Sequence, residues 1–463
     1  MKDKFQEVFD WCQDNSPDAL EFVEKLLQEC RVLSSEPDEN FSKILTDKAT
    51  VRLVEQIVDS HALFRPNSGD SLVSLKKLEA LFTEINRKVN GRSINSLLAL
   101  HKIAEHIDRA IADNLHLLFL RRILRNGGEM VLKDADIFTI PRLFTSRQIS
   151  QMSGRANRGH VQQLAADCLT NCSLHAASDI QVTVMANSFE RGVNEATGTL
   201  RNMEVAVGIL NHADQYELSD CHISPIDDTM DYFFGYCPDN ETQAELVLNA
   251  VGSSYEIGVD VLVLPECIAN TEQYEHILKA YSPEVSPKIA VLGSCHLIDN
   301  GKNVNRCNYF VRGLSRVQEK SNGVIGKSEE GRLIAEELHD PKFEVTVHIG
   351  RDWSFAVMIC KDFITPSFFN VLQRIAPSFV AVPALSRTLE PFLANATQLC
   401  VEQHCTIVLA NHPGAGSTEN AAFLWPEAAE EFWLKATVQD IEHVPLLYIS
   451  SRIDGAFYRK SLS

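Results

Sequence analysis

The chain has 463 residues, of which 45% are hydrophobic and 23% are charged, and its formal net charge is −19. This composition excludes an intrinsically disordered protein, and the length predicts two domains rather than a single core. The negative charge disfavours a nucleic-acid or anionic-membrane partner, because phosphate groups are bound by clustered Lys and Arg.

The first residues, MKDKFQEVFDWC, contain no long apolar segment behind their lysines. We therefore expect no signal peptide. No apolar run approaches the roughly 20 residues that a membrane-spanning helix needs, so no membrane partner is expected. Twelve cysteines at irregular spacing then predict reduced thiols and a cytoplasmic location, with no disulfide framework.

Residues 1–126 have the apolar spacing of helices throughout. In the stretch SPDALEFVEKLLQEC we expect Ser16 to cap the helix and Pro17 to occupy its first position. Further helical patterns cover Ser71–Val89 and Ser93–Leu124. No fixed repeat period is present. We predict an all-α helical domain that serves assembly or docks a protein partner.

Residues 127–200 are predicted to form a connecting region that is partly helical. His160, Cys168, Cys172 and His175 fall within it, and these residue types can bind zinc. Cys168 and Cys172, however, stand four residues apart on a helical pattern rather than in a short zinc knuckle. Ordinary half-buried thiols are favoured, and neither a metal nor another cofactor is predicted.

Residues 201–463 predict an α/β domain, because short β-branched apolar runs alternate with helical stretches. Runs that are apolar on both faces are typical of sheets covered by helix layers. A hairpin is expected near 306–320. The other strands are expected near residues 203–210, 259–265, 288–297, 353–360, 378–385 and 405–414.

Reactive side chains follow three of these strands. Glu266 follows VLVLP, Lys320 ends the arm of the hairpin, and Cys360 ends SFAVMIC. Catalytic groups of α/β sheets gather at the carboxyl ends of strands, so the three could converge on one pocket. Each alone has an ordinary interpretation: a solvated loop carboxylate, a surface lysine and a small buried thiol.

In this order, DVLVLPE, NYFVRGLSRVQEK and FAVMICKDF resemble the glutamate, lysine and cysteine motifs of the nitrilase superfamily of carbon–nitrogen hydrolases. The resemblance covers about residue 203 to the end of the chain. It implies an α-β-β-α sandwich that usually forms homo-oligomers. It also implies that Cys360 is the nucleophile, Glu266 the general base and Lys320 the cation that stabilises the oxyanion. A thiol with an ordinary pKa of about 8.5 needs such neighbours to become a nucleophile.

The resemblance implies supporting roles for two further residues. The backbone N–H of Lys361, directly after the nucleophile, would be a second oxyanion donor. The family often carries a second glutamate shortly after the lysine, to orient the substrate or the lysine. Glu329 and Glu330 both stand in that region, and we prefer Glu329.

The sequence departs from the family pattern at three places: the short spacing between Glu266 and Lys320, the residue after Cys360, and a long insertion after the first strand. Lys361 replaces an aromatic residue, and its charge could lower the pKa of the thiol or favour an anionic substrate. A long insertion, NHADQYELSDCHISPIDDTMDYFFGYCPDNE, follows the first strand and could cover the site or a partner surface. Lys327 is an alternative to Lys320, because it lies within reach of the same segment.

Taken together, these features predict a hydrolase that acts on non-peptide carbon–nitrogen bonds, of amide or nitrile type, through a cysteine thioester. Its partner would be a small-molecule amide or nitrile. Hydrolysis and acyl transfer both stay open. The alternative is a nitrilase-fold interaction module, a catalytically weak component of a bacterial assembly of the defence type. The helical half and the short spacing between Glu266 and Lys320 favour that alternative.

Overall fold

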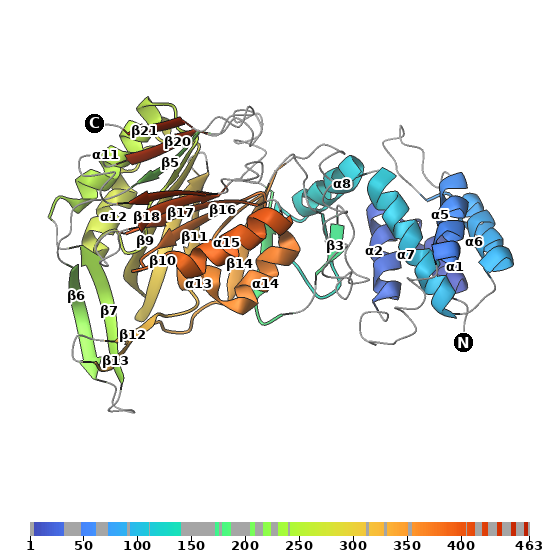
Figure 1. The fold of residues 1–463 in the computed structure, drawn as a ribbon, viewed down its shortest axis with the longest axis horizontal. Helices are drawn as coiled ribbons and strands as arrows, with labels where there is room; N and C mark the ends of the chain where they lie inside the picture. The colour runs from blue at the N-terminus through green and yellow to red at the C-terminus, as the bar shows by residue number, and fades with distance from the viewer. Residues whose placement is uncertain are drawn as a thin grey trace. The chain divides into compact units, whose positions relative to one another are not determined.

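The chain forms two compact units in the computed structural model (Figure 1), the first comprising Met1–Arg125 and Leu132–Ser178 and the second Asn126–Val131 and Asp179–Ser463. The predicted connecting region thus contributes residues to both units. The structure describes residues 4–31, 48–61, 73–89, 93–110, 112–139, 172–175, 178–186, 204–208, 216–223, 230–238, 241–311, 314–327, 331–350, 354–403, 405–412, 419–424, 433–437, 446–450 and 458–461.

Helices dominate the first unit, as the periodicity predicted. An antiparallel pair of short strands, β2 (Ile137–Thr139) and β3 (Cys172–Leu174), belongs to the same unit. No helix in the described ranges is both long and apolar enough to cross a membrane. The helices are α1 (Lys4–Asn15), α2 (Ala19–Cys30), α5 (Lys48–Ser60), α6 (Leu75–Val89), α7 (Ser93–Ala110) and α8 (Ala112–Arg125).

The start of helix α2 differs from the prediction. Asp18, not Ser16, is the N-cap: its side chain accepts a hydrogen bond from the Glu21 N–H, and the Glu21 side chain accepts one from the Asp18 N–H. This capping box satisfies two helix-end donors at once. Ser16 has a φ of +46° and its N–H donates to the Cys12 carbonyl, so it closes α1 instead. Pro17 accordingly lies before the cap.

The second unit contains a large sheet of eight strands and another of seven. The eight-stranded sheet has the order β1 (Glu129–Val131), β4 (Gln181–Met185), β14 (Glu344–Ile349), β15 (Ser354–Val357), β16 (Phe379–Ala384), β17 (Thr406–Asn411), β18 (Glu419–Leu424) and β19 (Trp433–Thr437). The seven-stranded sheet has the order β11 (Leu314–Glu319), β10 (Lys302–Val311), β9 (Ile289–Asp299), β8 (Val261–Val263), β5 (Glu204–Gly208), β20 (Leu446–Ser450) and β21 (Tyr458–Ser461).

These two sheets lie face to face, because β16 and β17 contact β8, β9 and β5. Helices α11 (Gln243–Glu256) and α12 (Thr271–Ala280) cover the seven-stranded sheet, and α15 (Glu390–Gln403) packs on β17 and β18 beside α13 (Lys361–Ile364) and α14 (Pro366–Ile375) (Figure 1). A single turn of 3₁₀ helix, η3 (Pro283–Val285), follows α12. The second unit is therefore an α-β-β-α sandwich, which confirms the predicted fold class.

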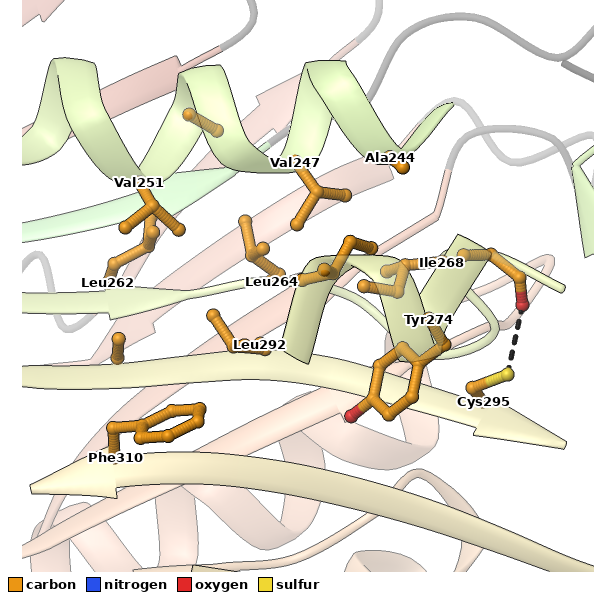
Figure 2. Packing of buried hydrophobic residues seen from close by; sticks show 14 of the residues in the cluster. Ala244, Val247, Val251, Leu262, Leu264, Ile268, Tyr274, Leu292, Cys295 and Phe310 are labelled. Atoms are coloured by element: carbon orange, nitrogen blue, oxygen red, sulfur yellow. Dashed lines mark hydrogen bonds between the residues drawn. The ribbon is translucent and has the colours of Figure 1, made fainter. Parts of the chain in front are cut away.

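The core between α11, α12 and the seven-stranded sheet positions the strand that precedes Glu266. Leu262, Leu264 and Leu292 pack toward Val247 and Val251 of α11 (Figure 2). Since side chains alternate along a strand, the intervening residues of β8 and β9 face the other sheet. Both faces of β8 are thus buried, which explains its unbroken apolar run.

A third, four-stranded sheet joins the predicted insertion to the rest of the second unit. Its order is β12 (Ile325–Lys327), β13 (Leu333–Glu336), β7 (Met230–Pro238) and β6 (Tyr216–Ile223). The insertion supplies β6 and β7, and β7 runs parallel to β13 with Phe233 opposite Glu336. Neither this sheet nor β13 was predicted from the sequence.

Gly293 allows the loop after β8 to lie close to β9. Its φ is +73°, and a Cβ atom at this position would lie 2.1 Å from the Pro265 carbonyl oxygen and 2.8 Å from the Ile268 side chain. No side chain other than hydrogen fits there. Gly293 therefore fixes the path of Pro265, the residue before Glu266.

We expect Gly293→Ala to lower the free energy of unfolding by about 2–4 kcal/mol, since it combines left-handed strain with a backbone clash. Gly258→Ala is the matched control, because Gly258 has a φ of +82° and a Cβ atom there would meet no other atom within 4 Å. The control should cost only about 1–2 kcal/mol. Urea unfolding of both variants measures the difference, and equal costs would contradict the close approach.

A buried tyrosine–histidine pair links the two large sheets. The Tyr309 hydroxyl of β10 lies 2.6 Å from Nε2 of His348 in β14. Burial, with a smaller contribution from Arg316, lowers the pKa of His348 to about 3. Burial also lowers the pKa of His412, which follows β17, to about 3. Both histidines are therefore neutral at neutral pH.

Acid should destabilise the second unit through these histidines. An exposed histidine has a pKa of 6.5, so below that pH the unfolded chain binds protons that the folded chain does not. Stability is complete above pH 6.5 and is lost as the pH falls toward the folded pKa. At about pH 5 each histidine should lower the free energy of unfolding by about 2 kcal/mol. Urea unfolding at neutral pH and at about pH 5 tests this, and His348→Gln should lose less than the wild type between them.

Candidate active site

The carboxyl end of β16 holds the candidate base and nucleophile on neighbouring backbone groups. The Glu266 N–H donates to the Ala384 carbonyl at 3.2 Å, and the Cys360 N–H donates to the Pro383 carbonyl at 2.8 Å. Lys320 directly follows β11, and its N–H donates to the Asn305 carbonyl at 2.8 Å. Three strand ends that are distant in sequence thus meet at one place.

Two carboxylates share the ammonium group of Lys320. Its Nζ lies 2.6 Å from Glu266 Oε1 and 2.6 Å from Glu336 Oε2. Asn305 Nδ2 also bridges the pair, donating to Oε1 of both glutamates at 2.9 and 2.8 Å. All four side chains are buried. Buried charges are tolerated only when they are paired in this way.

Glu336, like Asn305, is a site residue that the sequence did not indicate. It is the last residue of β13 and stands 16 positions after Lys320. The predicted second glutamate, Glu329, lies outside the described residues, as does Glu330, and its role stays a prediction. The hairpin of β12 and β13 lengthens the spacing between lysine and glutamate, and its half-exposed strands carry only a weak apolar pattern.

The carboxylate of Glu336 accepts hydrogen bonds on both oxygens. Oε1 accepts from His296 Nε2 at 2.9 Å and from Asn305, and Oε2 accepts from Lys320 and from the Val324 N–H at 3.0 Å. Burial raises the pKa of Glu336, but the Lys320 charge and the His296 bond outweigh burial and hold it below its ordinary value. Glu336 is therefore a fixed anion.

Lys320 is held in its cationic form. Burial lowers the pKa of its ammonium group, but the charges of Glu266 and Glu336 outweigh burial and raise the pKa well above its ordinary value. Lys327, the alternative in the sequence, is an exposed residue of β12. Of these two lysines, Lys320 is thus the one placed beside Glu266.

Cys360 lies on a sharp turn between β15 and α13. Its φ of +43° and ψ of −111° are strained for a residue with a side chain, and such strain is concentrated at functional sites. The residue is 3% exposed, and its Sγ lies 3.8 Å from the Leu385 carbonyl. Burial raises the pKa of the thiol, Glu266 raises it further and Lys320 lowers it, with a net increase. The resting thiol is protonated and needs a base.

The residues after Cys360 hold the loop that follows Lys320. Asp362 accepts from the backbone N–H groups of Ser321 and Asn322, both at 2.8 Å, and from Asn322 Nδ2 at 2.6 Å. Burial raises the pKa of Asp362 to about 6. Lys361 Nζ donates to the Gly323 carbonyl at 2.7 Å. The position of Lys320 is therefore coupled to the turn that carries Cys360.

The oxyanion role of Lys361 concerns its backbone rather than its side chain. Lys361 is the first residue of α13, and the first N–H groups of a helix have no partner within it. Its N–H can therefore donate to a ligand beside Cys360, and this role stays a prediction.

The residue types that could bind zinc were found in the sequence of the connecting region, away from Cys360. Among the described residues, no group of three or more His, Cys, Asp or Glu side chains could hold a metal ion. Of the residues that prompted the zinc hypothesis, His160 and Cys168 lie outside the described ranges, and Cys172 is buried in β3.

Neither the family models nor the curated proteins contain a match to this chain. Among solved structures, an amidase from Nesterenkonia sp. is similar over 54% of this chain and 90% of its own, with 15% identity and a TM-score of 0.39. A mutant of the Nesterenkonia AN1 amidase, described as from the nitrilase superfamily, is similar over 55% of this chain and 92% of its own, with 14% identity and a TM-score of 0.39. Saccharomyces cerevisiae Nit3, a member of branch 10 of that superfamily, is similar over 55% of this chain and 91% of its own, with 16% identity and a TM-score of 0.37.

Removing the shared cation should be costly. Lys320→Met leaves two buried carboxylates without their counter-charge, so we expect the free energy of unfolding to fall by about 3–5 kcal/mol. Adding Glu336→Gln should recover part of that loss, because one of the repelling charges is removed. Lys279→Met, which breaks an exposed pair with Glu275, is the control and should cost less than about 1 kcal/mol. Urea unfolding measures all three, and equal costs for the two lysine variants would contradict the shared pair.

Proposed function

We propose that the second unit hydrolyses non-peptide carbon–nitrogen bonds, of amide or nitrile type, through a cysteine thioester. The observation that carries the proposal is the Lys320 ammonium group held between Glu266 and Glu336 beside the strained turn of Cys360. The burial of the thiol supports a small-molecule substrate rather than a folded polypeptide.

The hydrogen bonds of Glu266 and Glu336 support different roles for the two residues. Both oxygens of Glu336 are occupied by donors, so it cannot readily accept another proton. Among the described residues, the hydrogen-bond donors to the Glu266 carboxylate, Asn305 and Lys320, both lie at Oε1. Oε2 of Glu266 is then the atom that takes a proton, and the thiol of Cys360 interacts with this carboxylate.

The first half of the reaction forms the thioester. Glu266 accepts the proton of Cys360 as Sγ attacks the substrate carbon, and negative charge develops on the substrate oxygen or nitrogen. Lys320 keeps its proton, because its pKa is raised, and stabilises that charge together with the N–H of Lys361. For an amide, Glu266 returns the proton to the leaving nitrogen as the carbon–nitrogen bond breaks, which leaves an acyl group on Cys360. For a nitrile, protonation of the nitrogen gives a thioimidate, and addition of water followed by loss of ammonia gives the same acyl group.

The second half releases the acid. Water attacks the thioester carbon, Glu266 takes the proton of that water, and the second tetrahedral intermediate collapses. Sγ leaves and is reprotonated by Glu266, so the enzyme returns to its starting state. An acyl-transfer reaction would differ only in the nucleophile of this half.

The cytoplasmic location, homo-oligomer formation and a protein partner for the helical unit stay predictions from the sequence.

Selective alkylation of the thiol tests the proposal. Iodoacetamide at about pH 6, below the pKa of an ordinary thiol, should label Cys360 faster than Cys267, a buried neighbour whose pKa burial also raises. Glu266→Gln should slow the labelling of Cys360 and lower ammonia release from short aliphatic amides by about 10²–10⁴-fold. Peptide mapping by mass spectrometry locates the adducts. If Cys360 labels no faster than Cys267, the hydrolase proposal fails and the interaction module remains.

A further inference from the structure

The insertion reaches the candidate site through aromatic side chains of β7. The ring of Phe234 stacks on the imidazole of His296, with 4.9 Å between centroids and 21° between planes. The ring of Phe233 lies 6.3 Å from the same imidazole in a tilted arrangement. His296 itself belongs to β9 and is 3% exposed. Two neighbouring rings therefore restrict how the imidazole can turn.

The imidazole in turn contacts the fixed anion of the site. His296 Nε2 lies 2.9 Å from Glu336 Oε1. Since an ionised carboxylate can only accept, Nε2 carries the hydrogen of this bond. Glu336 then binds Lys320, and Lys320 binds Glu266. A continuous series of contacts leads from Phe234 to the proposed base.

The backbone of β7 supports the same point. Phe233 stands opposite Glu336 in the parallel pairing of β7 with β13, and its carbonyl accepts from the Glu337 N–H at 2.9 Å. The Glu336 N–H is bound on the other side by the Val324 carbonyl at 2.8 Å. The insertion thus holds both the main chain and, through His296, the side chain of Glu336.

We propose that His296 is a positioning residue for Glu336 and Lys320, and that Phe234 of the insertion fixes His296 for this role. The inference rests on the proposed function, because it concerns the same site. Without the His296 donor, Glu336 Oε1 keeps only Asn305 among the donors described above. The carboxylate is then held less firmly by its three remaining donors, and a larger share of the Lys320 charge pairs with Glu266. A stronger pairing with Lys320 stabilises the anionic form of Glu266 and makes it a weaker base. Proton removal from Cys360 then slows.

Two amide substitutions isolate the hydrogen bond from the ring stack. In His296→Gln the side-chain nitrogen reaches the place of Nε2, whereas in His296→Asn it reaches only the place of Nδ1. Both variants lose the aromatic ring equally. We expect His296→Asn to lower the rate of Cys360 alkylation by iodoacetamide by about 10–100-fold, and His296→Gln to restore most of that rate. Phe234→Leu, which keeps the bond but frees the ring, should fall between wild type and His296→Asn.

The amide substrates of the previous section provide a second measurement. A positioning role lowers kcat in His296→Asn and leaves KM nearly unchanged, because the contact acts on the base and not on the substrate. If His296→Gln and His296→Asn lose the same rate, His296 only fills space and the inference is wrong.

A double-mutant cycle separates failure of this inference from failure of the hydrolase proposal. The stabilities of His296→Asn, Glu336→Gln and the double variant, measured by urea unfolding, test the contact without any turnover. A coupling between the two sites supports positioning of Glu336 even if wild-type Cys360 labels no faster than Cys267. Additive costs overturn it, whatever the reactivity of the thiol.

Discussion

One ammonium group held between two carboxylates is the interaction on which the site of the second unit depends. A lysine as buried as Lys320 loses its hydration, and only close counter-charges offset that loss. Glu266 and Glu336 supply them from two different sheets. The pair therefore forms only when β8, β11 and β13 have all reached their native places. The site is a consequence of the complete sandwich and not of any one motif.

Two glutamates of identical chemistry receive different roles from their donors. Four donors converge on the carboxylate of Glu336, whereas Asn305 and Lys320 both bind Glu266 at a single oxygen. A carboxylate with donors on both oxygens stays ionised, and one whose donors gather at a single oxygen can exchange a proton at the other. Environment rather than residue type thus assigns the fixed anion and the proposed base.

The sequence predicted Glu266, Lys320 and Cys360 because each stands in a motif that resembles one of the family's motifs, and Lys320 needed that motif, since β11 before it is mostly exposed. Both faces of β8 and β15 are buried, so their patterns are easily recognised. Glu336 ends a short strand with two residues that are not buried, and its pairing partner, β7, lies far earlier in the chain. Nothing local distinguishes it from Glu329 or Glu330. The predicted N-cap of α2, Ser16, was wrong for a related reason. Ser16 and Asp18 are both good capping residues, and only the reciprocal bond with Glu21 decides between them.

The parallel pairing of β7 with β13 limits how the site can assemble. Parallel strands need a long connection, and here strands β8 to β11 of the seven-stranded sheet lie between the partners in sequence. Pairing across such a separation costs loop entropy before it brings any stabilisation. The segment that places Glu336 is therefore expected to join late, after β8 to β11 have formed the surface on which His296 lies. The insertion, which the sequence suggested could cover the site or a partner surface, pairs through β7 with the strand that carries Glu336 and so supports the charge pairing of the site.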